Sequence, residues 1–266
     1  MPAEAAAEQR VAWPGLGRAV SDPRSWFQRR GAAPLGRVLD DAALSAARTA
    51  FDELVPRHGV TGPYATIVHD AWRHSTVLAA MVPQLGSIAC AAIEVPELVL
   101  FHDHLLHKPA GGADMEWHQD FSYLPLDRAD GLTLWIALDD ITEDNGCLYY
   151  VLGSHVLGER RAAWGLTGDG DPRAALAPIA VEASEPGAPA PTGAGCAVAH
   201  HAFVWHRSPR NDSGAPRRSW ALSFVVPEAR WSPAHSPHPR SAVSPRHEGQ
   251  ELEADLLRVR SAATAP

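Results

Sequence analysis

The sequence predicts an all-β sandwich or jelly-roll core with helices on its N-terminal side, and two observations indicate this fold class. Residues 217–226 alternate between a small polar face and an apolar face, as a strand does when it separates a cavity from a core. Asn145-Gly146 is a strong tight-turn signal between two β-prone runs at 133–139 and 147–151, which predicts a β-hairpin. Short strands separated by turn signals are typical of sandwiches and jelly rolls.

The two longest runs with helical spacing lie in the N-terminal third. Residues 1–35 show no sustained period and are interpreted as a loosely held arm. A helix is expected after Asp40, a good N-cap residue. A second helix is expected from Ser75 to about Ile93, broken or kinked near Pro83 and Gly86. Apolar residues of the first helix recur at helical spacing: Leu44, Ala47, Phe51 and Leu54. Both helices are expected to pack on the outside of a sheet and to carry no chemistry.

The remaining chain reads mainly as strands and loops, with strands expected at about 98–108, 115–124 and 196–205. Residues 158–195 are rich in Gly, Pro and Ala, and loops of this length are usually lids, substrate walls or disordered insertions. The tail after Pro227 is interpreted as peripheral, with a helical-looking patch at 251–259. We therefore expect one domain, 1–266, whose core is about 36–227, with the arm and tail outside it.

Composition narrows the range of partners and compartments. The net charge of −8 argues against nucleic acid or an anionic membrane as the main partner, because both need a basic face. Cys90, Cys147 and Cys196 lie far apart without a CxxC spacing, which favours buried thiols in a reducing cytoplasm over a disulfide framework. The first ten residues lack the apolar run of a signal peptide, and no stretch is expected to reach transmembrane length. A cytoplasmic protein acting on a small molecule is expected.

The stretch Trp117-His118-Gln119-Asp120 carries the first chemical signal. In an extended strand, residues two apart point to the same face, so His118 and Asp120 are expected to converge on one point. Two imidazoles and one carboxylate with open positions suit non-haem Fe(II). A lone His-x-Asp is weak evidence, so a third ligand and an anchor for a co-substrate are needed.

Residues 206–218 supply both. His206 is followed by Ser208, a turn and an arginine pair. On the alternating strand 217–226, Arg217 falls on the small polar face and Arg218 on the apolar face, so the pattern selects Arg217 as the cation that reaches into a cavity.

With "WHQDFSYLPL", "TLWIALDDITEDNGCLYYVLGSH" and "DHLLHKP", these residues resemble the phytanoyl-CoA dioxygenase family over about residues 98–226. The resemblance implies a double-stranded β-helix (jelly roll) and an enzyme that uses Fe(II), 2-oxoglutarate and O2. It implies that His118, Asp120 and His206 are the metal ligands and the catalytic residues. The family positions further imply that four residues contact the co-substrate: Arg217, Ser208, Trp135 and His104. A guanidinium suits a buried carboxylate because its planar fork matches the two oxygens.

The resemblance implies hydroxylation of a small-molecule C–H bond, with release of succinate and CO2. Because Asp120 is present, halogenation, which needs that site for chloride, is disfavoured. Desaturation or cyclisation within the family, a cupin-like non-redox metalloprotein and a non-catalytic binding relative stay open. Arg207 and Arg210 stand near the expected mouth, where they either contact an anionic substrate or are solvated. Bacterial family members act on amino acids and natural products, and the sequence does not say which substrate applies or what the oligomeric state is.

Overall fold

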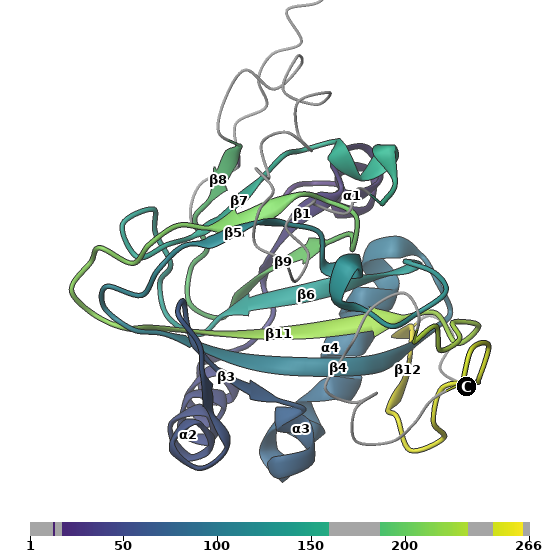
Figure 1. The fold of residues 1–266 in the computed structure, drawn as a ribbon, viewed down its shortest axis with the longest axis horizontal. Coiled ribbons are helices and arrows are strands. Elements are labelled where there is room, and N and C mark those ends of the chain that lie inside the picture. Colours follow the sequence, from purple (N-terminus) through teal and green to yellow (C-terminus); the bar gives the residue numbers. More distant parts are fainter. Residues whose placement is uncertain (1–12, 14–17, 160–186, 234–246, 263–266) are drawn as a thin grey trace, which may run out of the picture.

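The computed structural model describes residues 13, 18–159, 187–233 and 247–262, which form two antiparallel sheets (Figure 1). The larger, eight-stranded sheet has the order β1-β9-β6-β11-β4-β3-β2, with β12 also paired to β4. Its strands are β1 (Ala32–Arg37), β2 (Val60–Thr61), β3 (Thr66–His69), β4 (Glu97–Lys108), β6 (Gly131–Ala137), β9 (Cys196–His200), β11 (Arg217–Val225) and β12 (Arg258–Arg260). The four-stranded sheet has the order β5-β10-β7-β8, from β5 (Met115–His118), β7 (Leu148–Tyr150), β8 (Ala188–Ala190) and β10 (His206–Ser208). The predicted jelly-roll class is confirmed.

The two faces of β11 separate the core from the space between the sheets. Trp220, Leu222 and Phe224 are buried in a cluster shared with the helices, whereas Arg217 and Ser223 line a cavity between the sheets. This confirms the face assignment predicted from alternation. A second buried cluster joins the sheets beside the cavity, with members such as Trp135, Val198, Leu148 and Tyr150.

Helices α1 (Pro23–Arg30), α2 (Asp41–His58), α3 (Ala71–His74) and α4 (Thr76–Ile93) accompany the larger sheet. The Asp40 carboxylate accepts from the Ala43 N–H at 2.8 Å and caps α2, as predicted. Ser75 caps α4 in the same way. Of the two alternatives predicted near Pro83 and Gly86, a break is wrong, because α4 is one helix that continues through both residues. Burial of its apolar face against the sheet outweighs the hydrogen bond that proline cannot make.

Helix α4 is also long and apolar enough, by length and composition, to cross a membrane, with a mean hydropathy of 1.7 over 18 residues. The expectation that no stretch reaches that length was therefore wrong. A core helix passes the same test, and Leu78, Val82 and Leu85 of α4 are fully buried in the main cluster. The feature is weak evidence for a span.

The N-terminal arm is more ordered than predicted within the residues that the structure describes. Asp22 caps α1, Gly31 ends it with a φ of 75°, and β1 pairs antiparallel with β9. Ala32 and Ala33 are fully buried. The short length of α1 hid its capping signals from a search for periodicity.

Three local predictions were wrong: a hairpin, the length of one strand and a helical patch. The Asn145-Gly146 turn exists, but the strands on either side of it do not pair with each other. β6 pairs with β9 and β11 in the larger sheet, and β7 pairs with β10 and β8 in the smaller one. The turn therefore connects the two sheets and does not close a hairpin. The expected strand 115–124 ends at His118, and a 3-10 helix follows at Asp120–Tyr123. The patch at 251–259 contains no helix and leads into β12, which pairs with β4. Leu252 and Leu256 are buried there, so the described part of the tail contributes to the core.

Candidate metal centre and co-substrate pocket

His118, Asp120 and His206 come together between the sheets. His118 ends β5 and His206 begins β10, and the two residues are direct cross-strand partners. Asp120 opens the 3-10 helix, where its Oδ1 lies 3.7 Å from His118 Nε2 and 3.4 Å from His206 Nε2. One potential ligand atom from each residue lies within 4.8 Å of the others, so among the described residues this group could hold a metal ion. Two imidazoles and one carboxylate on one side of a point fit an iron site.

Hydrogen bonds to the backbone orient both imidazoles. His118 Nδ1 lies 2.8 Å from the Glu116 carbonyl oxygen, and His206 Nδ1 lies 3.0 Å from that of Val204. A carbonyl only accepts, so Nδ1 carries a proton in each ring, and Nε2 is the atom that faces Asp120 and is left for a metal. Burial acts to lower the pKa of His206, but the Asp120 carboxylate raises it overall, so His206 carries positive charge more readily than His118. Burial, together with the charge of His206, lowers the pKa of His118 to about 3. The ring is therefore neutral at physiological pH, as a metal ligand must be.

Asp120 is fixed through its second oxygen. Oδ2 lies 2.9 Å from the Thr133 hydroxyl and 3.0 Å from His200 Nε2, while the Tyr150 hydroxyl lies 3.0 Å from His200 Nδ1. Burial acts to raise the pKa of Asp120, but His206 and His200 together hold it well below its usual value. The carboxylate is thus ionised, with Oδ2 engaged and Oδ1 directed at the two ligand imidazoles.

Sequence reasoning missed Thr133 and His200. They are register partners on β6 and β9, and Thr133 shares its strand face with Trp135. Applying the same alternation to 131–137 as to β11 would have placed Thr133 in the cavity. For His200 the sequence offers no such signal, because 196–205 is mainly apolar and the neighbouring residue, His201, is also a histidine, so the pattern does not say which of the two faces the cavity.

We predict that His200→Phe weakens Fe(II) affinity by about 10- to 100-fold, the usual cost of removing a partner that orients a metal ligand. His200→Gln, which keeps an N–H donor, should recover part of the loss. The measurement is anaerobic Fe(II) binding by equilibrium dialysis, with folding followed by circular dichroism. His107→Phe, on the strand face toward Phe51, is the matched control. Unchanged metal affinity in His200→Phe would show that the Thr133 bond alone suffices.

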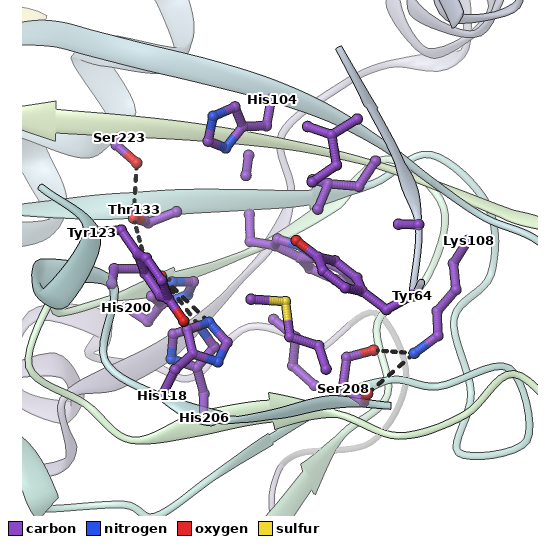
Figure 2. A pocket seen from close by; sticks show the side chains of 18 of the residues that line it. Tyr64, His104, Lys108, His118, Tyr123, Thr133, His200, His206, Ser208 and Ser223 are labelled. Carbon is purple, nitrogen blue, oxygen red and sulfur yellow. Dashed lines mark hydrogen bonds and ion pairs between the residues drawn. The ribbon is translucent and has the colours of Figure 1, made fainter. Parts of the chain in front are cut away.

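The cavity beside the triad has a volume of about 510 Å³ and reaches all four residues expected at the co-substrate: Arg217, Ser208, Trp135 and His104. Figure 2 shows the ligand histidines gathered on one side of this pocket, with Ser208 and Lys108 on the other. Other segments that line it include 64–69 and 114–116, with residues such as Tyr64, Ile67 and Met115. Residues 160–186, the bulk of the expected lid, lie outside the described residues.

Arg217 is only 4% exposed. It donates to the Ser208 hydroxyl at 3.0 Å, to the Gly146 carbonyl at 3.1 Å and to the Ser219 hydroxyl at 2.9 Å. Its guanidinium carbon lies 5.7 Å from the centre of the Trp135 ring. Burial lowers its pKa to about 10, so the side chain keeps its charge at neutral pH. Arg218 instead pairs with Asp139 on the other face.

Of the other residues that the sequence suggested as contacts, His104 lines the cavity, whereas Arg207 and Arg210 do not. His104 lies between His69 and His102, with ring centroids 4.6 Å and 4.3 Å away. Arg207 lies over the Trp117 ring at 5.3 Å, and Arg210 pairs with Asp212 at 3.0 Å. Neither arginine is among the described residues that line the cavity. Lys108, which sequence reasoning did not consider, does line it and is 1% exposed.

A jelly roll that holds two histidines and one aspartate beside a buried arginine defines the class of non-haem iron oxygenases. Within that class, the chain belongs to the phytanoyl-CoA dioxygenase (PhyH) family, whose model matches residues 27–219. The predicted family is confirmed.

Known relatives and solved structures agree with this assignment. Phytanoyl-CoA dioxygenase domain-containing protein 1 of Mus musculus is 30% identical over 167 residues, 61% of this chain and 54% of the relative. The chain thus spans about half the length of the curated relatives it matches. A probable alpha-ketoglutarate-dependent hypophosphite dioxygenase of Stutzerimonas stutzeri is 41% identical over 56 residues, 21% of this chain and 20% of the relative.

Among solved structures, the alpha ketoglutarate dependent carbocyclase SnoK of nogalamycin biosynthesis superposes with a TM-score of 0.75 at 24% identity, covering 92% of this chain and 100% of SnoK. EvdO2 of Micromonospora carbonacea var. aurantiaca, complexed with 2-oxoglutarate, gives a TM-score of 0.63 at 25% identity, covering 85% and 97%. These likenesses establish the shared fold.

Proposed function

We propose that this chain is a non-haem Fe(II)- and 2-oxoglutarate-dependent dioxygenase that hydroxylates an unactivated C–H bond of a small molecule. One observation supports this most: the His118, Asp120 and His206 group opens into the same cavity as buried Arg217. A metalloprotein of non-redox function needs no buried cation beside its metal. The activities of the relatives, and the 2-oxoglutarate in the EvdO2 complex, support the same function.

Each residue has a defined task in this proposal. His118, Asp120 and His206 hold Fe(II), leaving the cavity side open. Arg217 binds the distal carboxylate of 2-oxoglutarate, with Ser208 beside it and Trp135 and His104 as walls. When bound, iron and the keto acid supply the oxidising chemistry, with succinate and CO2 as products. The protein positions the reacting groups and excludes water.

The substrate is proposed to be a small natural product or amino-acid-like molecule. Several cavity residues are apolar, among them Ile67, Leu106, Met115 and Leu148, and two tyrosines, Tyr64 and Tyr123, also face it. Cyclisation or epimerisation is the second candidate, because SnoK is described as a carbocyclase and SnoN as an epimerase. We propose a cytoplasmic enzyme, which agrees with three buried free thiols.

The test is anaerobic addition of Fe(II), then 2-oxoglutarate, to metal-free protein. A weak visible metal-to-ligand charge-transfer band is expected only when both are present. Succinate, which lacks the 2-keto group, is the control and should give no band. If folded protein gives no band with 2-oxoglutarate, the oxygenase proposal fails and a cupin-like or binding role becomes the better account.

A further inference from the structure

Lys108 is the only lysine in the chain, so every other residue among the 23 Lys and Arg is an arginine. It ends β4, where its direct cross-strand partner on β11 is Arg217. Like charges placed directly opposite on neighbouring strands destabilise a sheet. Both side chains are nearly inaccessible, which strengthens the repulsion, and both line the cavity. Such an arrangement calls for an anion that the protein itself does not supply.

The described residues provide no carboxylate in contact with Lys108. Its ammonium donates to the Ser208 carbonyl at 3.1 Å, to the Ser208 hydroxyl at 2.9 Å and to the Pro209 carbonyl. All three acceptors are neutral. The two acids whose charges act on Lys108, Asp114 and Asp212, each accept a hydrogen bond from Arg210.

Ser208 brings the two cations to one place. Its hydroxyl oxygen accepts from Lys108 at 2.9 Å and from Arg217 at 3.0 Å, while its proton is donated to the Gly146 carbonyl at 2.9 Å. Both lone pairs and the proton of this hydroxyl are therefore used. A carboxylate entering the pocket would have to take its hydrogen bonds from the cations and not from Ser208.

We propose that Lys108 and Arg217 together bind the distal carboxylate of 2-oxoglutarate, with Ser208 acting to position both cations. This inference rests on the proposed function and adds a binding residue to it. A lysine suits this task because its ammonium is a point charge on a flexible stem and can move from a carbonyl to a carboxylate.

A dependence on pH follows from the surroundings of Lys108. Burial and the facing charge of Arg217 lower the pKa of Lys108 to about 7, while Asp114 and Asp212 partly oppose this shift. Above that pH the free protein therefore carries a largely neutral Lys108, and binding the carboxylate must restore its proton. Affinity for 2-oxoglutarate is expected to fall by on the order of tenfold per pH unit above about pH 7.

A single lysine allows a direct test on the full chain. Protein grown with 13Cε-lysine, and with no lysine in any tag, should give one lysine NMR signal. With Zn(II) in place of paramagnetic iron, its titration midpoint is expected near pH 7 without 2-oxoglutarate and more than one unit higher with it. An unmoved midpoint, in protein whose Fe(II) form shows the charge-transfer band, overturns the inference but leaves the proposed function intact. Absence of that band would instead overturn the proposed function.

Variants provide the second test, by anaerobic titration of the band with 2-oxoglutarate. Lys108→Arg keeps its positive charge across the pH range and should bind 2-oxoglutarate with little dependence on pH. Lys108→Met should bind on the order of 10- to 100-fold more weakly below pH 7, also without the pH dependence, consistent with one lost charge-assisted bond. Arg210→Gln, on an exposed arginine of the neighbouring loop, should titrate like wild type. If Lys108 had a purely structural role, both variants would keep the wild-type pH dependence of 2-oxoglutarate affinity. If Lys108→Met does not fold, the NMR titration decides the question alone.

Discussion

Asp120→Ala is expected to abolish Fe(II) binding at concentrations that saturate the wild-type protein, and with it the charge-transfer band and all turnover. The substitution removes one of three ligands, so the loss of affinity should exceed the roughly 10- to 100-fold cost of losing a ligand's partner. It also leaves the Thr133 and His200 donors without their acceptor, while His118 and His206 lose the charge between them. Two imidazoles alone do not hold Fe(II) tightly against water.

The measurement is Fe(II) binding by anaerobic dialysis, alongside thermal unfolding. Asp144→Ala, which removes an exposed carboxylate beside the Asn145-Gly146 turn, is the matched control and should bind like wild type. Without metal, Asp120→Ala should unfold at a lower temperature than wild type, because the lowered pKa of Asp120 means that its neighbours stabilise the ionised carboxylate, and its removal leaves two buried groups without their partner. Retained Fe(II) affinity in Asp120→Ala would exclude this residue as a ligand and, with it, the triad.

Local sequence patterns predicted the faces of single elements well. Alternation along β11 selected Arg217 for the cavity, and the structure places its guanidinium there. Capping at Asp40 and Ser75 predicted the starts of α2 and α4. These signals are local because a strand's period or a cap depends only on nearby residues.

Features that depend on pairing between distant segments were not predictable in the same way. The Asn145-Gly146 turn was recognised, but its flanking strands pair within different sheets. Asp120 converges with His118 from a 3-10 helix and not from the expected strand, so the convergence was predicted for the wrong local reason. Lys108 looked like an ordinary strand end, since only its register opposite Arg217 reveals the buried pair of charges.

Arg217→Met is expected to weaken 2-oxoglutarate binding by on the order of 100- to 10,000-fold while leaving Fe(II) affinity close to wild type. Two charge-assisted hydrogen bonds to a buried carboxylate account for a loss of this size, at about 1.5–3 kcal/mol each. The triad should be spared because the hydrogen bonds found for Arg217 go to Ser208, Ser219 and the Asn145-Gly146 turn, and not to a metal ligand. The measurements are the band titrated with 2-oxoglutarate and a separate Fe(II) titration. Arg218→Met, on the opposite strand face, is the control for losing an arginine from β11. If Arg217→Met weakened 2-oxoglutarate binding and Fe(II) binding equally, Arg217 would have a structural role.

The same variant also tests whether Lys108 and Arg217 form one anion site. Removing the guanidinium removes a facing positive charge, so the pKa of Lys108 should rise and its 13Cε signal should titrate later. Lys108 would then stay protonated to a higher pH than in wild type even without 2-oxoglutarate, although burial would still lower its pKa. If the two residues hold one carboxylate, the effects of their substitutions on 2-oxoglutarate affinity should not add. Lys108→Met should then weaken binding by a different factor in the Arg217→Met background than in wild type. Independent titration of Lys108 and additive losses would instead mean that the two cations occupy neighbouring but separate sites, with Arg217 alone binding the co-substrate.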